Sequence, residues 1–317
     1  MSQFVSETRL LGQFEGKVGG PLLIVICQMH GNEPAGTEGF RTVLDLLQQW
    51  QSDADFGFYG RMVGYIGNMA AHQMGIRYQE FDLNRIWKEA HIERARKYGD
   101  RRFPEYGELL ELQEVIQQEI DSYPAEQVFI MDMHTTTAKG GVFTIPGPSQ
   151  ESKDIVSSIH APTVNGLIEF LSGTLIQYVH EHYAGRAITS AAFESGQHVL
   201  PSSGRYATAG ILTTLCRMRM LPAAYLENEY NEELATYASM LPVQTKLVYR
   251  HAVTEKDEFR MLPGFKNFTP ITKGMLLAHD KNGEILSPFS GHMLMPLYQD
   301  KGDDGFFIVQ EIDEGLT

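Results

Sequence analysis

The chain has 317 residues, of which 43% are hydrophobic and 21% are charged, so its composition is that of a globular protein and excludes a disordered, collagen-like or coiled-coil chain. Its 26 Lys and Arg residues against 40 Asp and Glu residues give a net charge of −14. Because nucleic acids and anionic membranes are bound by basic surfaces, we expect neither as a partner.

The cysteine content and the apolar pattern point to the compartment. Two cysteines, Cys27 and Cys216, are too few for a disulfide framework, and Cys27 lies within an apolar run typical of a core. The segment from Met1 to Leu11 has no basic end and no long apolar stretch, so it is not a secretory signal. No window approaches the ~18 apolar residues that a membrane span needs. We therefore expect a cytoplasmic protein.

Up to about residue 240 the chain alternates apolar runs with helical patterns. Residues 22–27 form a continuous apolar run that predicts a strand buried on both faces, and a helix from Pro34 to Trp50 follows it. Further strands are expected at residues 59–66, 128–133 and 187–193. Helices are expected within residues 86–123, ending near Pro124, and at residues 165–183, 209–217 and 227–239. This order predicts an α/β fold.

Beyond Leu241 the helical period disappears and Gly and Pro become frequent. Short alternating segments occur at residues 245–253, 275–279, 284–286, 292–295 and 306–309. Such segments are typical of a small all-β unit. We therefore expect an α/β domain over residues 1–243 and a C-terminal β domain over residues 244–317.

Polar side chains follow three of the predicted strands. His30 and Glu33 follow the first, His134 follows the strand at 128–133, and Glu194 follows the strand at 187–193. Ligands of open α/β sheets bind at the carboxyl ends of the strands. Two imidazoles and one carboxylate can hold a catalytic zinc ion and leave one position for water, whose pKa then falls toward ~7. Glu194, outside this set, is placed to act as the general base.

Each of these residues also has an ordinary structural interpretation. A His-x-x-Glu pair occurs by chance, His134 is consistent with a loop histidine, and Glu194 is consistent with a helix cap or an ion pair. The segment Asp82–Arg85 offers a planar guanidinium for a carboxylate, with Asn84 beside it and Arg77 upstream. Surface ion pairs and a helix cap are the alternatives for that segment.

Taken in order, five motifs resemble the succinylglutamate desuccinylase/aspartoacylase family of zinc hydrolases, which are related to the zinc carboxypeptidases. The motifs are His30-Gly-Asn-Glu33, Arg77-Tyr78, Asp82-Leu-Asn-Arg85, Asp132-Met-His-Thr135 and Phe193-Glu-Ser-Gly196. The tail resembles the C-terminal β domain of the family through Leu262-Pro-Gly-Phe265 and Ser287-Pro-Phe-Ser-Gly291. The resemblance implies a zinc-carboxypeptidase-like mixed sheet flanked by helices, followed by a small β domain.

The resemblance also implies a role for each matching residue. His30, Glu33 and His134 match the ligands of one zinc ion per chain, and Glu194 matches the base that activates the zinc-bound water. Arg77 matches the arginine that, with zinc, stabilises the oxyanion. Asn84 and Arg85 match the pair that holds the substrate carboxylate.

The expected reaction is hydrolysis of the amide of a small N-acyl amino acid. A metallocarboxypeptidase acting on short peptides and a catalytically silent metal-binding protein are the alternatives, and homo-oligomer formation stays open. The family's aspartoacylases have a C-terminal tyrosine just before a proline, whereas this chain has Met295 before Pro296. The acyl group and the amino acid are therefore open, with Tyr183, Arg186 and His198 as candidates for reading the substrate side chain.

Overall fold

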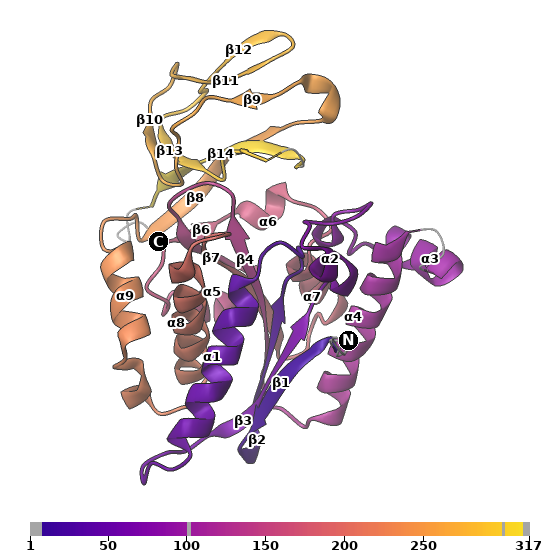
Figure 1. Ribbon diagram of the computed structural model, residues 1–317, viewed down its shortest axis with the longest axis vertical. Helices are drawn as coiled ribbons and strands as arrows, with labels where there is room; N and C mark the ends of the chain where they lie inside the picture. The colour runs from indigo at the N-terminus through magenta and orange to yellow at the C-terminus, as the bar shows by residue number, and fades with distance from the viewer. Residues whose placement is uncertain (1–7, 100–102, 300–301, 313–317) are drawn as a thin grey trace, which may run out of the picture.

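A large mixed β-sheet runs through the computed structural model, which describes residues 8–99, 103–299 and 302–312 (Figure 1). Most of the N-terminal segment considered above as a secretory signal lies outside the described residues. In spatial order the 11 strands of this sheet are β1 (Leu10–Glu15), β3 (Tyr59–Ile66), β2 (Lys17–Cys27), β4 (Val128–Thr136), β7 (Ile188–Gln197), β5 (Val142–Pro146), β6 (Thr163–Asn165), β8 (Gln244–Ala252), β14 (Asp304–Glu311), β13 (Gly291–Leu294) and β10 (Pro270–Ile271).

The centre of the sheet is parallel, and its outer parts are mixed. Strands β3, β2, β4 and β7 run parallel to one another, and β5 is antiparallel to β7. The central strands are apolar because both faces are covered, as the run at residues 22–27 predicts. A second, three-stranded sheet contains β12 (Gly283–Leu286), β11 (Leu276–Asp280) and β9 (Arg260–Met261).

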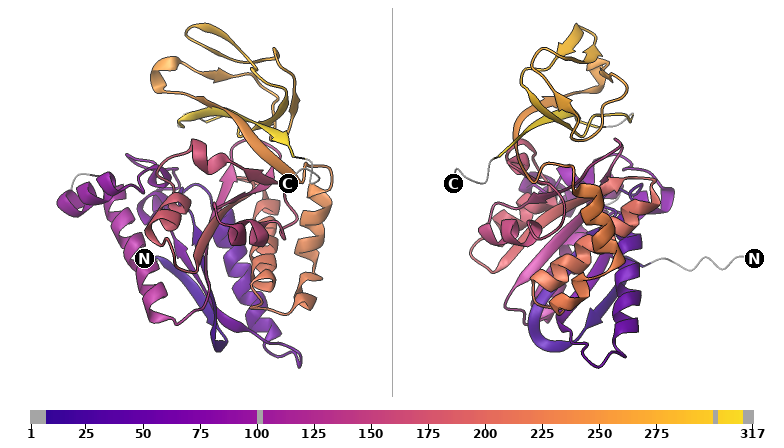
Figure 2. Two further views of the ribbon diagram at one scale, coloured as in Figure 1. Left: turned by 180° about the vertical axis from the view of Figure 1, so that it is seen from behind. Right: turned by 90° about the vertical axis from the view of Figure 1, so that its left-hand side faces the viewer.

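Helices cover both faces of the central sheet (Figures 1 and 2). One face carries α1 (Ala35–Trp50), α5 (Gln150–Val156), α8 (Pro201–Arg217) and α9 (Glu229–Ala238). The other face carries α3 (Glu89–Tyr98), α4 (Pro104–Ser122) and α7 (Leu175–His182). The short helices α2 (Met69–Met74) and α6 (Leu167–Phe170) and the 3-10 turns Leu83–Arg85, Ala223–Leu226 and Glu255–Asp257 lie in the connections.

The fold class expected from the sequence is confirmed, and most predicted elements are present. The strand predicted at residues 59–66 has the observed bounds, and the helix predicted from Pro34 begins one residue later. The helix predicted at residues 209–217 begins earlier, at Pro201. Cys27 is a free, buried core residue. Among the described residues, no helix is long and apolar enough to cross a membrane.

The C-terminal β region continues the central sheet. Strand β8 begins at Gln244 and pairs in parallel with β6, so the ladder crosses the boundary expected at residue 243. Strands β14, β13 and β10 extend the same sheet beyond β8 and lie over the end of the molecule where β4 and β7 finish (Figure 1). The division into two domains stays a prediction.

Candidate metal centre and active site

Three neighbouring parallel strands bring the predicted site residues together. Strand β2 pairs with β4, and β4 pairs with β7. In this register His134 lies directly beside Glu194, while Cys27, the last residue of β2, lies beside Met133. The loop that follows β2 therefore carries His30 and Glu33 to the same edge of the sheet, as expected from the polar strand ends.

The loop after β2 is held in a specific conformation. Gln28 adopts a left-handed backbone with φ of 51°, and its side chain donates to the Gly31 carbonyl at 2.9 Å and accepts from Thr37 Oγ1 at 2.7 Å. A Cβ atom on Gly31 would lie 2.1 Å from the backbone of Ala71, so only glycine fits there. These contacts fix the direction in which the loop presents the side chain of His30.

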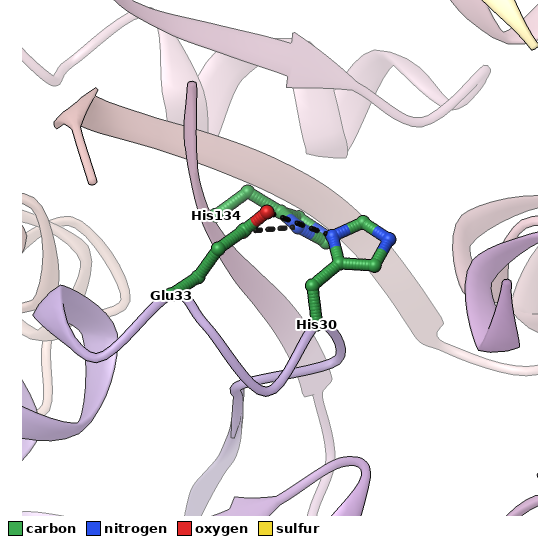
Figure 3. A group of neighbouring side chains, drawn as sticks. All are labelled: His30, Glu33 and His134. Atoms are coloured by element: carbon green, nitrogen blue, oxygen red, sulfur yellow. Dashed lines mark hydrogen bonds and ion pairs between the residues drawn. The ribbon is translucent and has the colours of Figure 1, made fainter. Parts of the chain in front are cut away.

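His30, Glu33 and His134 form a buried group that can hold a metal ion (Figure 3). Their ligand atoms all lie within 4.8 Å of one another. The Nδ1 atom of His30 is 2.9 Å from Glu33 Oε1, and the Nδ1 atom of His134 is 3.1 Å from Glu33 Oε2. The three side chains therefore converge on one point from the loop after β2 and from β4.

Each imidazole also contacts a further carboxylate through Nε2, the ring nitrogen that faces away from Glu33. Asp82 Oδ1 lies 3.1 Å from Nε2 of His30, and Asp132 Oδ2 lies 2.9 Å from Nε2 of His134. Metal-binding histidines commonly have this arrangement, in which the far ring nitrogen is fixed by a carboxylate and the near nitrogen faces the ion. Both rings thus offer Nδ1 as a ligand, and two nitrogens with one carboxylate suit zinc.

The charged groups around the site shift one another's pKa values. Burial alone would raise the pKa of Asp82, but His30 and Arg77 hold it well below its usual range. Burial would likewise lower the pKa of His134, but Asp132 and Glu33 raise it well above its usual value. The pocket therefore concentrates negative charge around its two imidazoles, which is an environment that attracts a cation.

Glu194 is buried beside the metal group without being part of it. Its side chain is 8% exposed, and Oε2 is a buried atom without a hydrogen-bond partner in the described structure. Burial raises its pKa from 4.5 to about 7. A carboxylate with a pKa near neutrality can both accept and return a proton, as a general base must.

The predicted arginines line the same pocket and are already paired with carboxylates. Arg77 donates to Asp82 at 2.9 Å and lies 3.6 Å from Glu33. Arg85 lies 3.3 Å from Asp304 of β14 and donates to its neighbouring carbonyl. The C-terminal β region therefore contributes directly to the pocket.

Asn84 is more tightly engaged than expected. Its amide nitrogen lies 3.2 Å from Asp132 and 3.2 Å from Nε2 of His134, and its oxygen accepts from the Leu175 backbone at 2.9 Å. The substrate role predicted for Asn84 stays a prediction, and it requires the amide to turn one N–H group away from these partners.

The structure also places residues around the site other than the predicted ligands, base and arginines. Asp132 was predictable, because a residue two positions before His134 shares its face of the strand. The contact between Asp82 and His30 joins residues 52 positions apart, and no pattern in the sequence indicates it. His198 lines the pocket, whereas Tyr183 packs among α4 and α7 and Arg186 is exposed away from the pocket.

Comparison with known proteins gives a consistent result. The family model of the succinylglutamate desuccinylase/aspartoacylase catalytic domain matches residues 19–190, more than half of the chain. No curated protein sequence matches with significance.

Three solved structures illustrate the structural likeness. The product-bound ectoine utilization protein EutE (DoeB) from Ruegeria pomeroyi is 16% identical, with a TM-score of 0.63, covering 94% of this chain and 87% of that one. The succinylglutamate desuccinylase from Chromobacterium violaceum is 16% identical, with a TM-score of 0.61 and coverage of 95% and 88%. The succinylglutamate desuccinylase/aspartoacylase from Rhodobacter sphaeroides is 16% identical, with a TM-score of 0.64 and coverage of 94% and 88%. At this identity the likeness establishes the fold.

Proposed function

Because the chain belongs to the succinylglutamate desuccinylase/aspartoacylase family, we propose that it hydrolyses the amide bond of an N-acyl amino acid with one zinc ion held by His30, Glu33 and His134. The observation that carries the proposal is the convergence of these three buried ligands next to Glu194. The products are a carboxylic acid and a free amino acid.

Zinc, when bound, supplies a Lewis acid that polarises the amide carbonyl and lowers the pKa of water. Glu194 accepts the proton of the attacking water through its unpartnered oxygen and returns it to the leaving nitrogen. Its raised pKa suits both steps, because the carboxylate neither holds nor releases the proton too strongly at neutral pH.

The two arginines have different roles, one at the oxyanion and the other at the substrate carboxylate. Arg77, fixed by Asp82, donates to the oxygen that becomes negative as the carbonyl is attacked. Arg85 and Asn84 hold the substrate carboxylate and so position the amide for attack, with Arg85 exchanging Asp304 for the substrate. A small N-acyl amino acid is the partner; a cytoplasmic location and the oligomeric state stay predictions.

The metal content and the substrate class can be tested on one sample. Protein purified without added metal is analysed for zinc and then assayed against N-acetyl amino acids, N-succinyl amino acids and short peptides, with free amine as the readout. We expect about one zinc per chain and turnover of the acyl amino acids. Faster cleavage of peptides would favour the carboxypeptidase alternative. Failure to take up any metal on reconstitution would overturn the site.

A further inference from the structure

One side of the pocket is apolar. Beyond the metal group, nine apolar side chains line the pocket, and we term six of them the apolar chamber: Ile145, Leu171, Ile176, Ala192, Met295 and Phe307. They come from β5, the end of α6, α7, β7, the loop after β13, and β14. Both the α/β part and the C-terminal β region therefore build this chamber.

The chamber begins next to the proposed base. Ala192 and Glu194 are two positions apart on β7, so they share one face of the strand and lie about 7 Å apart along it. Ile145 of β5 is the direct cross-strand partner of Ala192. A substrate whose amide lies at Glu194 therefore places a neighbouring group against this wall.

The wall has little freedom to rearrange. Ile145, Ile176, Ala192 and Phe307 belong to one buried cluster and are each at most 6% exposed. Close-packed side chains of this kind keep their positions, so the chamber is preformed.

Met295 is held in the wall at some conformational cost. Its backbone is left-handed, with φ of 47°, which is unfavourable for a residue other than glycine. The buried Asn267 fixes it by accepting from the Met295 amide at 2.6 Å while donating to Thr136 Oγ1 at 3.0 Å and to the Gly140 carbonyl at 2.7 Å. One side chain thus ties Met295 to the loop that follows the metal ligand of β4.

The charges of the pocket disfavour a second anionic group. Among the described residues that line it, the Lys and Arg side chains are Arg77 and Arg85, and each is paired with a carboxylate. Asp303 and Asp304 add negative charge on the side of the C-terminal β region. A substrate with a second carboxylate would find no unpaired cation there, and an unpaired buried charge is strongly unfavourable.

We infer that the apolar chamber selects substrates with an apolar group, so that this enzyme hydrolyses N-acyl amino acids with an aliphatic or aromatic substituent rather than doubly acidic ones. This inference rests on the proposed function, because it assigns the substrate class of the same site. The apolar group comes either from the amino-acid side chain or from the acyl chain, and both meet the wall by the same chemistry.

A substrate panel tests the inference and separates the two sources. The zinc-loaded protein is assayed with N-acetyl-leucine, N-acetyl-phenylalanine and N-hexanoyl-glycine against N-acetyl-aspartate and N-succinyl-glutamate. We expect kcat/KM for the best apolar substrate to exceed that for either acidic substrate at least tenfold, since each buried methylene contributes about fourfold. Comparison of N-acetyl-leucine with N-hexanoyl-glycine shows whether the amino-acid side chain or the acyl chain occupies the chamber. Faster hydrolysis of the acidic substrates would contradict the inferred selectivity of the chamber, although it would support the amidohydrolase function.

A charge placed in the wall provides a second test. Leu171 is half-buried at the chamber edge, so Leu171→Arg adds a cation without opening the core. We expect the ratio of apolar to acidic kcat/KM to fall at least tenfold. Leu286→Arg, at a 51% exposed position on β12, is the matched control and should keep the wild-type ratio. If Leu171→Arg does not fold, Leu171→Ala should extend the longest acyl or side chain accepted; an unchanged limit contradicts the inference.

Binding measurements keep the inference testable without turnover. Calorimetric titration of the zinc-loaded protein with hexanoate and with succinate compares an apolar acid with a doubly acidic one. We expect hexanoate to bind at least tenfold more tightly in the wild type, and this advantage to be lost in Leu171→Arg. Tighter binding of succinate would refute the inferred apolar selectivity, even if the protein hydrolysed none of the amides.

Discussion

Replacing Glu194 with Gln tests the base more sharply than any other change, because it keeps the shape of the side chain and removes only its proton-accepting capacity. The residue is buried beside His134 and has one oxygen without a partner, so the amide fits without new contacts. General acid–base catalysis contributes about 10²–10⁴-fold to rates, or about 2.7–5.4 kcal/mol of barrier. We expect Glu194→Gln to lose that factor in kcat while binding zinc as the wild type does.

The stability of the metal-free protein gives this prediction an independent readout. Burial raises the pKa of Glu194 from 4.5 to about 7, which corresponds to roughly 3 kcal/mol against the ionised form. Because the folded carboxyl holds its proton while the unfolded one has lost it, this group makes the wild type less stable as pH rises from 4.5 to 7. Glu194→Gln lacks this contribution, so its stability relative to the wild type should increase with pH over that range.

The assays are steady-state kinetics, zinc analysis and urea unfolding at several pH values. In the zinc-loaded wild type, kcat/KM should fall about tenfold per pH unit below the pKa of Glu194, because the base must be ionised. A bound cation lowers that pKa from its metal-free value of about 7. The decrease in kcat/KM at acidic pH should therefore begin at or below pH 7. A fully active Gln variant that retains zinc would refute the reasoning.

Further predictions concern the other polar residues of the pocket. Arg85→Ala should raise KM for carboxylate substrates about tenfold with little change in kcat, and equal effects on both in steady-state assays would contradict the anchor role. Arg77→Met should lower kcat by about 10²–10³ in the same assays, because it removes an oxyanion donor. Asp132→Ala should weaken zinc binding about 10–100-fold in chelator competition, because Nε2 of His134 loses its carboxylate. Removal of zinc with a chelator should abolish turnover and lower Tm, and added zinc should restore both; a Tm independent of zinc would contradict a bound metal.

The core of the fold was predictable because its signals are local. Apolar runs at residues 22–27 and 128–133 mark strands that are buried on both faces. The start of α8 was missed because Ser202, Ser203 and Gly204 are weak helix formers. Tertiary packing overrides that weakness, since a Cβ atom on Gly204 would lie 2.7 Å from the side chain of Glu38 on α1.

The site was predictable only as far as strand ends reveal it. His30 and Glu33 follow β2 and His134 lies near the end of β4, so a sheet that places those two strands side by side brings the three residues together. The outer contacts of the site depend on long-range pairing, as when Asp304 reaches Arg85 across 219 positions. No spacing in the sequence indicates which carboxylate will face which arginine.

The ladder between β6 and β8 has a consequence for how the molecule moves. Thr163 pairs with Gln244, and Asn165 pairs with Lys246, so the two parts of the chain share backbone hydrogen bonds where a hinge would otherwise lie. Arg250 reinforces this junction by donating to the Phe170 carbonyl at 2.7 Å. A relative motion of these two parts would have to break the β6–β8 backbone ladder, so the pocket that both parts line is tied together by the same hydrogen bonds as the sheet.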